Sequence, residues 1–212
     1  MADRYDVSSL AEAQYEPGSS DEVLKNLLGI TNSEEMDHAE ARALAIATDT
    51  LIHEYDEEYE FSPGDIRHMH QLWLGDIYEW AGQYRQVNIS KGEFSFAMAN
   101  RVPDLMEQFG NDQLSTYTPC KGMERAEIIK ALAEVHVEFE LIHPFREGNG
   151  RVGRILTTLM ALQAGLPLLN YDIFVEEKKA EYFSAIQSGL DRNYAPMEQL
   201  FTRIVENSLA SS

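Results

Sequence analysis

The residues best suited to chemistry lie in one short run, LIHPFREGNGRVGR, which spans residues 141–154. His143 can act as a general base, because the ordinary pKa of histidine lies near neutral pH. Glu147 offers a hard oxygen ligand, and Mg²⁺ in proteins is commonly held by one carboxylate together with the phosphates of a substrate. A proton acceptor and a metal ligand this close together indicate chemistry on a substrate that carries phosphate.

The same run predicts an anion site. It lies between two stretches with helical spacing, so it forms a loop that leads into a helix N-terminus, where free backbone N–H groups and the helix dipole attract phosphate. Gly148 and Gly150 let the backbone approach a ligand closely and adopt positive φ. Arg151 and Arg154 are three residues apart, which predicts two cations on one helix face above the site. The alternative is a glycine-rich turn that only caps a helix.

Charge narrows the classes of partner. The chain has 17 basic and 36 acidic residues, for a net charge of −19. Nucleic-acid binders need a basic face that neutralises phosphates, and no basic run occurs here, so no nucleic-acid partner is expected. The acidic run over residues 54–60 is expected to be a solvated helix end. An acidic protein that binds a nucleotide needs a local cationic pocket, which Arg151 and Arg154 would supply.

Length and composition predict one globular domain. A chain of 212 residues can bury a sizeable core without covalent cross-links. Its one cysteine, Cys120, cannot form an internal disulfide. The sequence has no basic start followed by an apolar run, and no apolar segment long enough to span a bilayer. We therefore expect a cytoplasmic protein with no membrane partner.

The elements that must position the site are mostly helical. Alternating apolar residues between Tyr84 and Ala97 predict one β-hairpin, which must lie on the helical body because a lone hairpin is not stable. Ser33 and Ser62 are the expected caps of two of the helices. The predicted organisation is an irregular lead-in over residues 1–18 and a single domain over 19–212. Apolar spacing predicts helices over 21–28, 33–55, 62–80, 101–117, 123–141, 151–164, 176–190 and 196–209.

From His143 to Arg154 every fixed position matches the signature of the Fic family, His-x-Phe-x-(Asp or Glu)-Gly-Asn-Gly-Arg-x-x-Arg. A chance match in a chain of this length is on the order of one in ten million. Residues 21–30 and 76–85 also resemble the family, so the similarity covers most of residues 15–207. The resemblance implies a mostly α Fic fold, with about eight helices around a central loop–helix active site and one β-hairpin flap.

The resemblance implies an Mg²⁺- or Mn²⁺-dependent transfer of AMP from ATP to a hydroxyl side chain of a target protein or of the enzyme itself. His143 would deprotonate the hydroxyl, and Glu147 would hold the metal between the α- and β-phosphates. Doc-type kinases of the wider family carry a lysine where Gly150 stands, so glycine there favours AMP transfer.

The resemblance also implies which residues bind ATP. Asn149 and the amides of the glycine loop would bind the α-phosphate, Arg151 the β-phosphate side, and Arg154 the γ-phosphate. The full set is Gly148, Asn149, Gly150, Arg151 and Arg154.

The hairpin resembles the family's flap, which aligns a segment of the target by strand pairing. By analogy with bacterial members of the family, a type II topoisomerase subunit is a candidate target. A homo-oligomer is also compatible with the sequence. The predicted flap residues are Ser90, Lys91, Gly92, Glu93, Phe94, Ser95, Phe96 and Ala97.

The run TRIVEN near the C-terminus resembles the family's inhibitory pattern, (Ser or Thr)-x-x-x-Glu-(Gly or Asn). In one class of the family this motif lies on the last helix, which is predicted here over about residues 196–209. Thr202 and Glu206 are four residues apart and share one side of that helix, and Asn207 completes the pattern. The resemblance implies that Glu206 pairs with Arg154 and denies it to the γ-phosphate. The alternative is an exposed glutamate near a frayed terminus.

Two other functions stay open. In some family members that keep the inhibitory glutamate, the same site removes AMP from modified proteins as a hydrolase. A regulatory module would keep the fold and bind nucleotide without turnover, although an intact His143, Glu147 and Arg154 speak against such decay. Outside the motif, His136 is predicted to be a hydrogen-bonded structural residue, and His68 and His70 are too poorly placed on a helix to share a metal.

Overall fold

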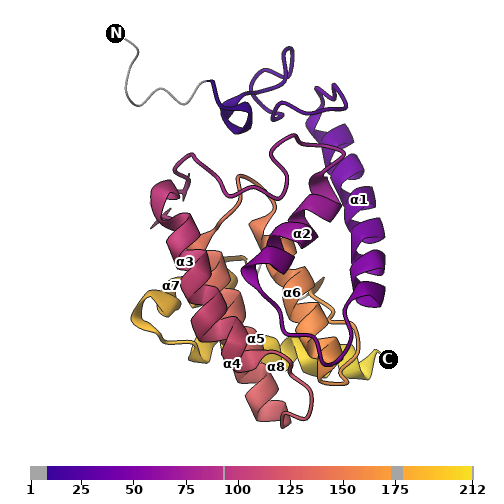
Figure 1. Cartoon of the computed structure of the whole chain (residues 1–212), viewed down its shortest axis with the longest axis vertical. Helices are drawn as coiled ribbons and strands as arrows, with labels where there is room; N and C mark the ends of the chain where they lie inside the picture. The colour runs from indigo at the N-terminus through magenta and orange to yellow at the C-terminus, as the bar shows by residue number, and fades with distance from the viewer. Residues whose placement is uncertain (1–8, 93, 173–178, 212) are drawn as a thin grey trace.

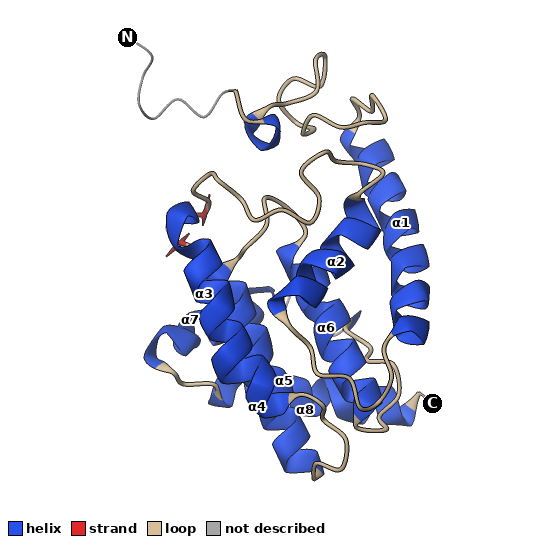
Figure 2. Cartoon of the chain, viewed as in Figure 1, coloured by secondary structure: helices blue, strands red, loops and turns tan. Residues whose placement is uncertain are grey.

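The computed structural model describes residues 9–92, 94–172 and 179–211. The fold is mostly helical, as predicted, with a small hairpin at one edge (Figures 1 and 2). Within these residues no helix is both long and apolar enough to cross a bilayer. The helices are α1 (Ser33–Glu54), α2 (Pro63–Leu74), α3 (Val102–Phe109), α4 (Ser115–Tyr117), α5 (Arg125–Ile142), α6 (Asn149–Gln163), α7 (Lys179–Ser188) and α8 (Ala195–Ala210), and the strands are β1 (Ser90–Lys91) and β2 (Phe94–Ser95).

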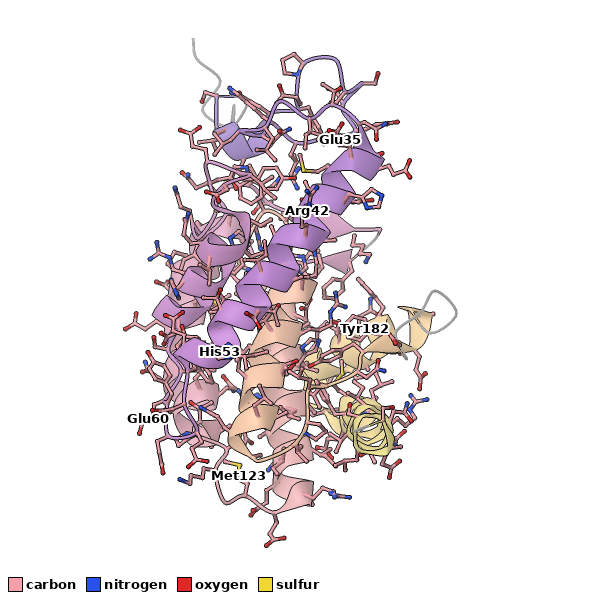
Figure 3. All side chains as sticks on the ribbon, turned by 90° about the vertical axis from the view of Figure 1, so that its right-hand side faces the viewer. Glu35, Arg42, His53, Glu60, Met123 and Tyr182 are labelled. Carbon is pink, nitrogen blue, oxygen red and sulfur yellow. The ribbon has the colours of Figure 1, made fainter. Side chains whose placement is uncertain are left out.

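Helix α5 forms the centre of the fold. It packs against α3, α6, α7 and α8, and residues such as Val135 and Phe139 are fully buried. A helix that is apolar around most of its circumference is stable only inside a protein. Helices α1 and α2 pack on each other and on α6, and Figure 3 shows α1 along this side with Arg42 and His53 on its outer face. The loop from α5 to α6 is therefore surrounded by other elements.

The N-cap predicted from the sequence is correct for α2 and wrong by one residue for α1. Ser62 caps α2 as predicted: its Oγ accepts from Asp65 N, and the Asp65 carboxylate accepts from Ser62 N at 2.8 Å. Helix α1 is capped instead by Asn32, which accepts from Glu35 N at 3.0 Å, so Ser33 is the first helical residue. Asparagine and serine are equally good caps, and sequence alone does not separate them.

The helix predicted over residues 21–28 is wrong. The chain there forms turns, and Leu24 makes an antiparallel bridge with Tyr15. The Asn26 side chain takes the hydrogen bonds that a helix would supply, since its Oδ1 accepts from Ile30 N at 3.0 Å and its Nδ2 donates to the Ile30 carbonyl at 2.9 Å. Asparagine competes with helix formation in this way.

The helix predicted over residues 62–80 ends early, at Leu74. The chain continues in turns, and the N–H groups of Ile77 and Tyr78 both donate to the Leu74 carbonyl. Ile77, Tyr78 and Trp80 are nevertheless buried. The apolar residues after Leu74 are therefore buried in turns, and their spacing resembles that of a helix although the helix has ended.

The remaining helices agree more closely with the prediction. The helix predicted over 101–117 is divided into α3, a π-helical segment at Gly110–Leu114 and α4. The first residues of the helix predicted over 176–190 lie outside the described residues, and α7 with a 3₁₀ turn at Gly189–Asp191 forms the rest. The helix predicted over 196–209 is α8.

The hairpin is shorter than predicted. Its ladder pairs Ser90 with Ser95 and Lys91 with Phe94, and residues 87–89 lie outside it. It leans on α7, as the prediction that it must lie on the helical body requires: the Lys91 ammonium lies 4.5 Å from the centre of the Phe183 ring. Glu93, one of the predicted flap residues, lies outside the described residues.

Candidate active site

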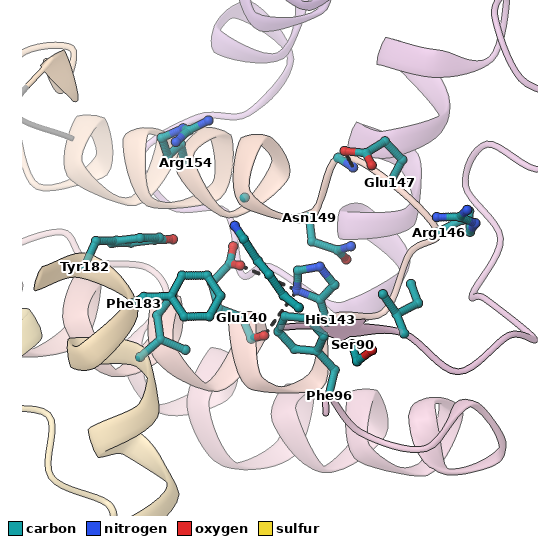
Figure 4. Close-up of a pocket in the computed structure, with 15 residues that line it drawn as sticks. Ser90, Phe96, Glu140, His143, Arg146, Glu147, Asn149, Arg154, Tyr182 and Phe183 are labelled. Carbon is teal, nitrogen blue, oxygen red and sulfur yellow. Dashed lines mark hydrogen bonds and ion pairs between the residues drawn. The ribbon is translucent and has the colours of Figure 1, made fainter. Parts of the chain in front are cut away.

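A cavity of about 450 Å³ opens where α5 ends and α6 begins. Residues of the hairpin and of α7 line it together with the loop that joins the two helices (Figure 4). The structure thus brings the predicted base, the predicted metal ligand and the glycine loop together around one space. The motif residues that line the cavity are His143, Glu147, Gly148, Asn149, Gly150 and Arg154.

His143 faces this cavity from the C-terminal end of α5. Its φ of 51° and ψ of 61° lie in the left-handed region, which residues other than glycine seldom adopt. Its ring stacks on Phe96 of the flap with 3.8 Å between ring centres, and Nδ1 lies 3.3 Å from the Glu140 carbonyl. A carbonyl only accepts, so we assign the proton to Nδ1, which leaves Nε2 with the lone pair that a base needs. Burial lowers the pKa of His143 to about 4, so its ring is neutral at physiological pH.

The two loop glycines differ in conformation. Gly148 has a φ of 85°, and a Cβ there would lie 2.6 Å from the Trp73 ring, so only glycine fits. Gly150 lies in the first turn of α6 with helical φ, and its surroundings leave room for a ligand. The prediction of positive φ is therefore right for Gly148 and wrong for Gly150. Helix α6 begins directly after Gly148, and this one residue in the left-handed region is enough to turn the chain into the helix.

The Asn149 side chain closes the loop on itself. Its Oδ1 accepts from Phe145 N at 2.8 Å, and its Nδ2 donates to the Phe145 carbonyl at 2.9 Å. The amide nitrogen has a second N–H beyond this bond, and the α-phosphate contact of Asn149 stays a prediction. The backbone N–H groups of Asn149 and Gly150 have no backbone acceptor among the described residues. They form the free N-terminal end of α6.

Glu147 lies at the edge of the cavity with 47% of its side chain exposed. Its Oε1 accepts from Gly148 N at 2.9 Å. Its carbonyl lies 3.1 Å from Nε2 of His70, a buried residue of α2 whose Nδ1 accepts from Gly82 N at 2.7 Å. Burial lowers the pKa of His70 to about 4, so this ring is neutral and donates to the loop through Nε2. This hydrogen bond from His70 therefore fixes the backbone of Glu147 in the loop.

The two motif arginines point to different places. Arg154 lines the cavity (Figure 4). Arg151 does not, since its Nη1 lies 2.6 Å from the Glu40 carboxylate of α1 and its guanidinium lies 4.5 Å over the Trp73 ring. The prediction that both arginines stand above one anion site is wrong for Arg151. The reason is the Glu40 carboxylate, which is only 5% exposed and draws the nearest cation toward α1.

Arg85 is a site residue that the sequence did not reveal. Its buried guanidinium donates from Nε to the His143 carbonyl at 2.7 Å. It also donates from Nη1 to the Val87 carbonyl at 2.8 Å and from Nη2 to the Ala97 carbonyl. One side chain thus joins the segment before the flap and the last flap residue to the backbone of the base. Arginine ordinarily lies at the surface, and nothing in the sequence marks this one as buried.

Glu140 is the second residue that sequence reasoning missed. It lies one turn before His143 on α5 and lines the cavity, although its side chain is only 5% exposed. Burial raises the pKa of its carboxyl to about 7. Its distance of three residues from the motif histidine was the only signal in the sequence.

The C-terminal motif does not reach the cavity. Ile204, Val205 and Ser208 are buried on the face by which α8 packs on its neighbours, which leaves Glu206 and Asn207 exposed. Across the described residues no ion pair joins Glu206 to Arg154. Thr202 donates within its own helix, to the Glu198 carbonyl at 2.8 Å. The predicted Glu206–Arg154 pair is therefore absent from this structure.

Other predicted roles can be compared with the structure. His136 is buried and lies 2.8 Å from the Tyr182 hydroxyl, which confirms a hydrogen-bonded structural role. Exposed His68 pairs with Glu54. Cys120 is buried, and burial raises the pKa of its thiol to about 12, so the thiol is not activated.

Glu147 is the residue that could hold a metal. In the described part of the chain, no three His, Cys, Asp or Glu side chains gather in a way that could bind a metal ion by themselves. Mg²⁺ is commonly held by one or two carboxylates together with substrate phosphates and water. A half-exposed carboxylate beside a free helix N-terminus fits that arrangement.

Known proteins resemble this chain in sequence and in fold. The Fic/DOC family matches residues 60–161. The chain is 28% identical over 195 residues to the probable protein adenylyltransferase Fic of Escherichia coli K12, which covers 88% of this chain and 90% of that protein. The N-terminal Fic domain of an effector protein from Bartonella sp. AR 15-3 superposes with a TM-score of 0.78 at 21% identity, covering 98% of this chain and 97% of that one. The BepC protein of Bartonella tribocorum, solved with bound AMPPNP, gives a TM-score of 0.73 at 20% identity, covering 93% and 98%.

The matched region contains the hairpin, the central helix α5 and the whole motif. The chain therefore contains a Fic/DOC-family domain over residues 60–161.

Proposed function

We propose that this protein is a protein adenylyltransferase, which moves AMP from ATP to a hydroxyl side chain of a target protein or of itself. The observation that carries the proposal is that His143, Glu147, Arg154 and the free amides of α6 all surround one cavity of about 450 Å³. The names of curated relatives, including the E. coli protein, support the same activity.

His143 acts as the general base. At physiological pH its ring is neutral and its Nε2 is free, so it takes the proton of the target hydroxyl while that oxygen forms a bond to the α-phosphorus. The bond between the α-phosphorus and the bridging oxygen breaks, and pyrophosphate leaves with its electrons. The stacked Phe96 ring covers one face of the base and keeps it in the cavity.

The phosphates bind at the start of α6. The N–H groups of Asn149 and Gly150 point out of the helix end and can donate to phosphate oxygens, with the helix dipole in support. Arg154, on the same helix, binds the γ-phosphate end of the chain. Arg151 acts from outside the cavity, because its ion pair with Glu40 ties α6 to α1. Most of the catalysis is positioning and electrostatic stabilisation.

Glu147 would hold Mg²⁺ or Mn²⁺ together with the phosphates. The bound metal supplies Lewis-acid stabilisation of the charge that develops on the phosphate oxygens. Two hydrogen bonds fix the position of Glu147: Gly148 N donates to its carboxylate, and His70 donates to its backbone carbonyl.

The flap offers the surface for the target. Strands β1 and β2 form a two-stranded sheet, and an edge of such a sheet can add a strand of a target through main-chain hydrogen bonds. Arg85 holds the flap against His143, so a segment paired with the flap would carry its hydroxyl toward the base.

The test is incubation of purified protein with cell lysate and with ATP labelled at the α-phosphate, followed by mass spectrometry of labelled proteins. Type II topoisomerase subunits are the first candidates to add in purified form. We expect AMP on protein hydroxyls with the wild type, none with His143→Ala, and full labelling with His68→Ala, a histidine on the exposed side of α2. His143→Ala should still bind ATP, since the base acts on the target.

The same assay separates the alternatives. Loss of AMP from pre-labelled proteins without any gain would assign a hydrolase. Binding of ATP with neither gain nor loss would assign a regulatory module.

A further inference from the structure

Glu140 is buried at the cavity in contact with the base. Its Oε2 lies 3.7 Å from Nδ1 of His143, and its backbone carbonyl lies 3.3 Å from the same nitrogen. Figure 4 shows the carboxylate beside the His143 ring on the cavity side of α5. The other oxygen, Oε1, is fully buried and has no hydrogen-bond partner among the described residues.

The Glu140 carboxylate packs against Gly153 of α6, where the absence of a side chain leaves room for it. A Cβ at Gly153 would lie 2.9 Å from Oε1, closer than real Cβ contacts, so a larger residue there would have to displace the carboxylate. A buried carboxylate without a full set of hydrogen bonds costs free energy. A hydrophobic residue at position 140 would pack against α6 without that cost. The carboxylate is therefore better explained by an electrostatic role than by packing.

We propose that Glu140 is a positioning residue for the base, and that its carboxylate stabilises the imidazolium that forms when His143 takes the target's proton. This inference rests on the proposed function. The histidine needs a counter-charge, because burial and the nearby cations Arg85 and Lys91 all disfavour its charged form. Glu140 is the carboxylate that lies within ion-pair distance of His143 among the described residues.

The Glu140 carbonyl and carboxylate act on one nitrogen. The carbonyl accepts the Nδ1 proton in the resting state and so fixes the tautomer with Nε2 free. When the ring becomes positive, the carboxylate 3.7 Å from Nδ1 offsets the new charge. A carboxylate that orients and stabilises a catalytic histidine in this way is the third member of the serine protease triad.

The charged and titratable groups around Glu140 come from four elements. His136 lies on α5 and His143 directly after its end, Arg154 lies on α6, Lys91 on β1 and Tyr182 on α7. Arg154 and Lys91 favour the ionised carboxyl, whereas burial opposes it, and the pKa of Glu140 lies at about 7. The carboxylate is therefore ionised above neutral pH, where it can support the base.

The test compares Glu140→Gln with Glu138→Gln. Glu138 lies on the same helix, outside the active-site cavity, where it accepts from the Tyr194 hydroxyl, so it is a partly buried control on the same element. Steady-state AMP transfer is measured from pH 6 to 9, ATP affinity by calorimetry, and the His143 ring signals by NMR over the same pH range.

We expect Glu140→Gln to lower kcat by more than about tenfold, with the KM for ATP within about threefold of the wild type. The rise of kcat with pH near 7 should disappear in this variant and stay in Glu138→Gln. The NMR signals of His143 should show an inflection near pH 7 in the wild type and the control, caused by ionisation of the adjacent carboxyl, and none in Glu140→Gln.

A folded Glu140→Gln protein with an unchanged kcat would overturn the inference. So would a wild-type His143 titration with no inflection near pH 7, and that result can be read even if Glu140→Gln does not fold. If the wild type transfers no AMP, the proposed function fails, while the NMR titration still decides whether Glu140 acts on His143.

Discussion

The Arg151 guanidinium lies 2.6 Å from the Glu40 carboxylate, and this ion pair joins the signature motif to the first long helix of the fold. Arg151 Nη2 also lies 3.2 Å from Glu147 Oε1, so the pair reaches the cavity edge through one further contact. The Tyr78 hydroxyl donates to the other Glu40 oxygen at 2.7 Å. A motif residue that could have bound phosphate thus holds α1, α6 and the loop together.

Breaking this pair should destabilise the protein. Glu40→Ala leaves Arg151 and the Tyr78 hydroxyl without their buried acceptor, and removing one partner of a buried pair costs about 3–5 kcal/mol. Because 27% of the Arg151 side chain is exposed, water screens part of the loss, and we expect about 2–3 kcal/mol in urea unfolding. Asp49→Ala, on the exposed face of the same helix, should change stability by less than about 1 kcal/mol. Equal effects of the two changes would show that the pair is unimportant.

Activity should require a divalent metal and the Glu147 charge. Glu147→Gln keeps an acceptor for Gly148 N but removes the negative charge that a metal needs, so the loop should stay intact. We expect AMP transfer to fall by about a hundredfold or more, and excess Mg²⁺ not to restore it. Exposed Glu79→Gln is the control. Full activity of the Glu147→Gln variant, or of the wild type in a chelator, would contradict this assignment.

Autoinhibition by Glu206 stays a prediction, and the structure argues for a negative result. Glu206 is exposed on α8 and has no ion pair with Arg154 among the described residues. We expect Glu206→Gly to leave labelled-AMP incorporation within about twofold of the wild type and to cost about 1 kcal/mol of helix stability. A large gain in incorporation, with unchanged circular dichroism, would show that α8 moves to the cavity in solution.

The free energy of unfolding should fall as the pH is lowered from about 6.5 to 4. Burial lowers the pKa values of His70 and His143 to about 4 and that of His136 to about 3, all below the ordinary 6.5. The unfolded chain therefore binds more protons than the fold in this range, and each unit of pKa difference contributes about 1.4 kcal/mol. Glu140 opposes the trend, since its raised pKa makes stability fall as the pH rises from about 4.5 to 7.

Urea unfolding at several pH values checks this prediction. His70→Asn should reduce both the stability at pH 7 and its slope below pH 6.5, and His68→Ala, at an exposed position on the same helix, is the control for loss of a histidine. A slope that His70→Asn does not alter would contradict the assignment of a neutral, buried ring.

Much of the fold could be predicted because its helices are long and periodic. The predicted ranges 123–141 and 196–209 lie within two residues of the bounds of α5 and α8. The failures occurred where side chains or burial replaced helical hydrogen bonds, at Asn26 and after Leu74. Periodicity reports which residues are buried, and a buried turn can imitate a helix over a short stretch.

The sequence by itself determined the parts of the site that are local in the chain. His143, Glu147, Gly148 and Arg154 fall within one loop and the first two turns of α6, so their types and spacing are enough to place them around one cavity. Tertiary structure alone decided the rest, because those roles depend on partners far along the chain. Glu40 turns Arg151 away from the cavity, Arg85 ties the flap to the base, and the docked face of α8 leaves Glu206 in solvent.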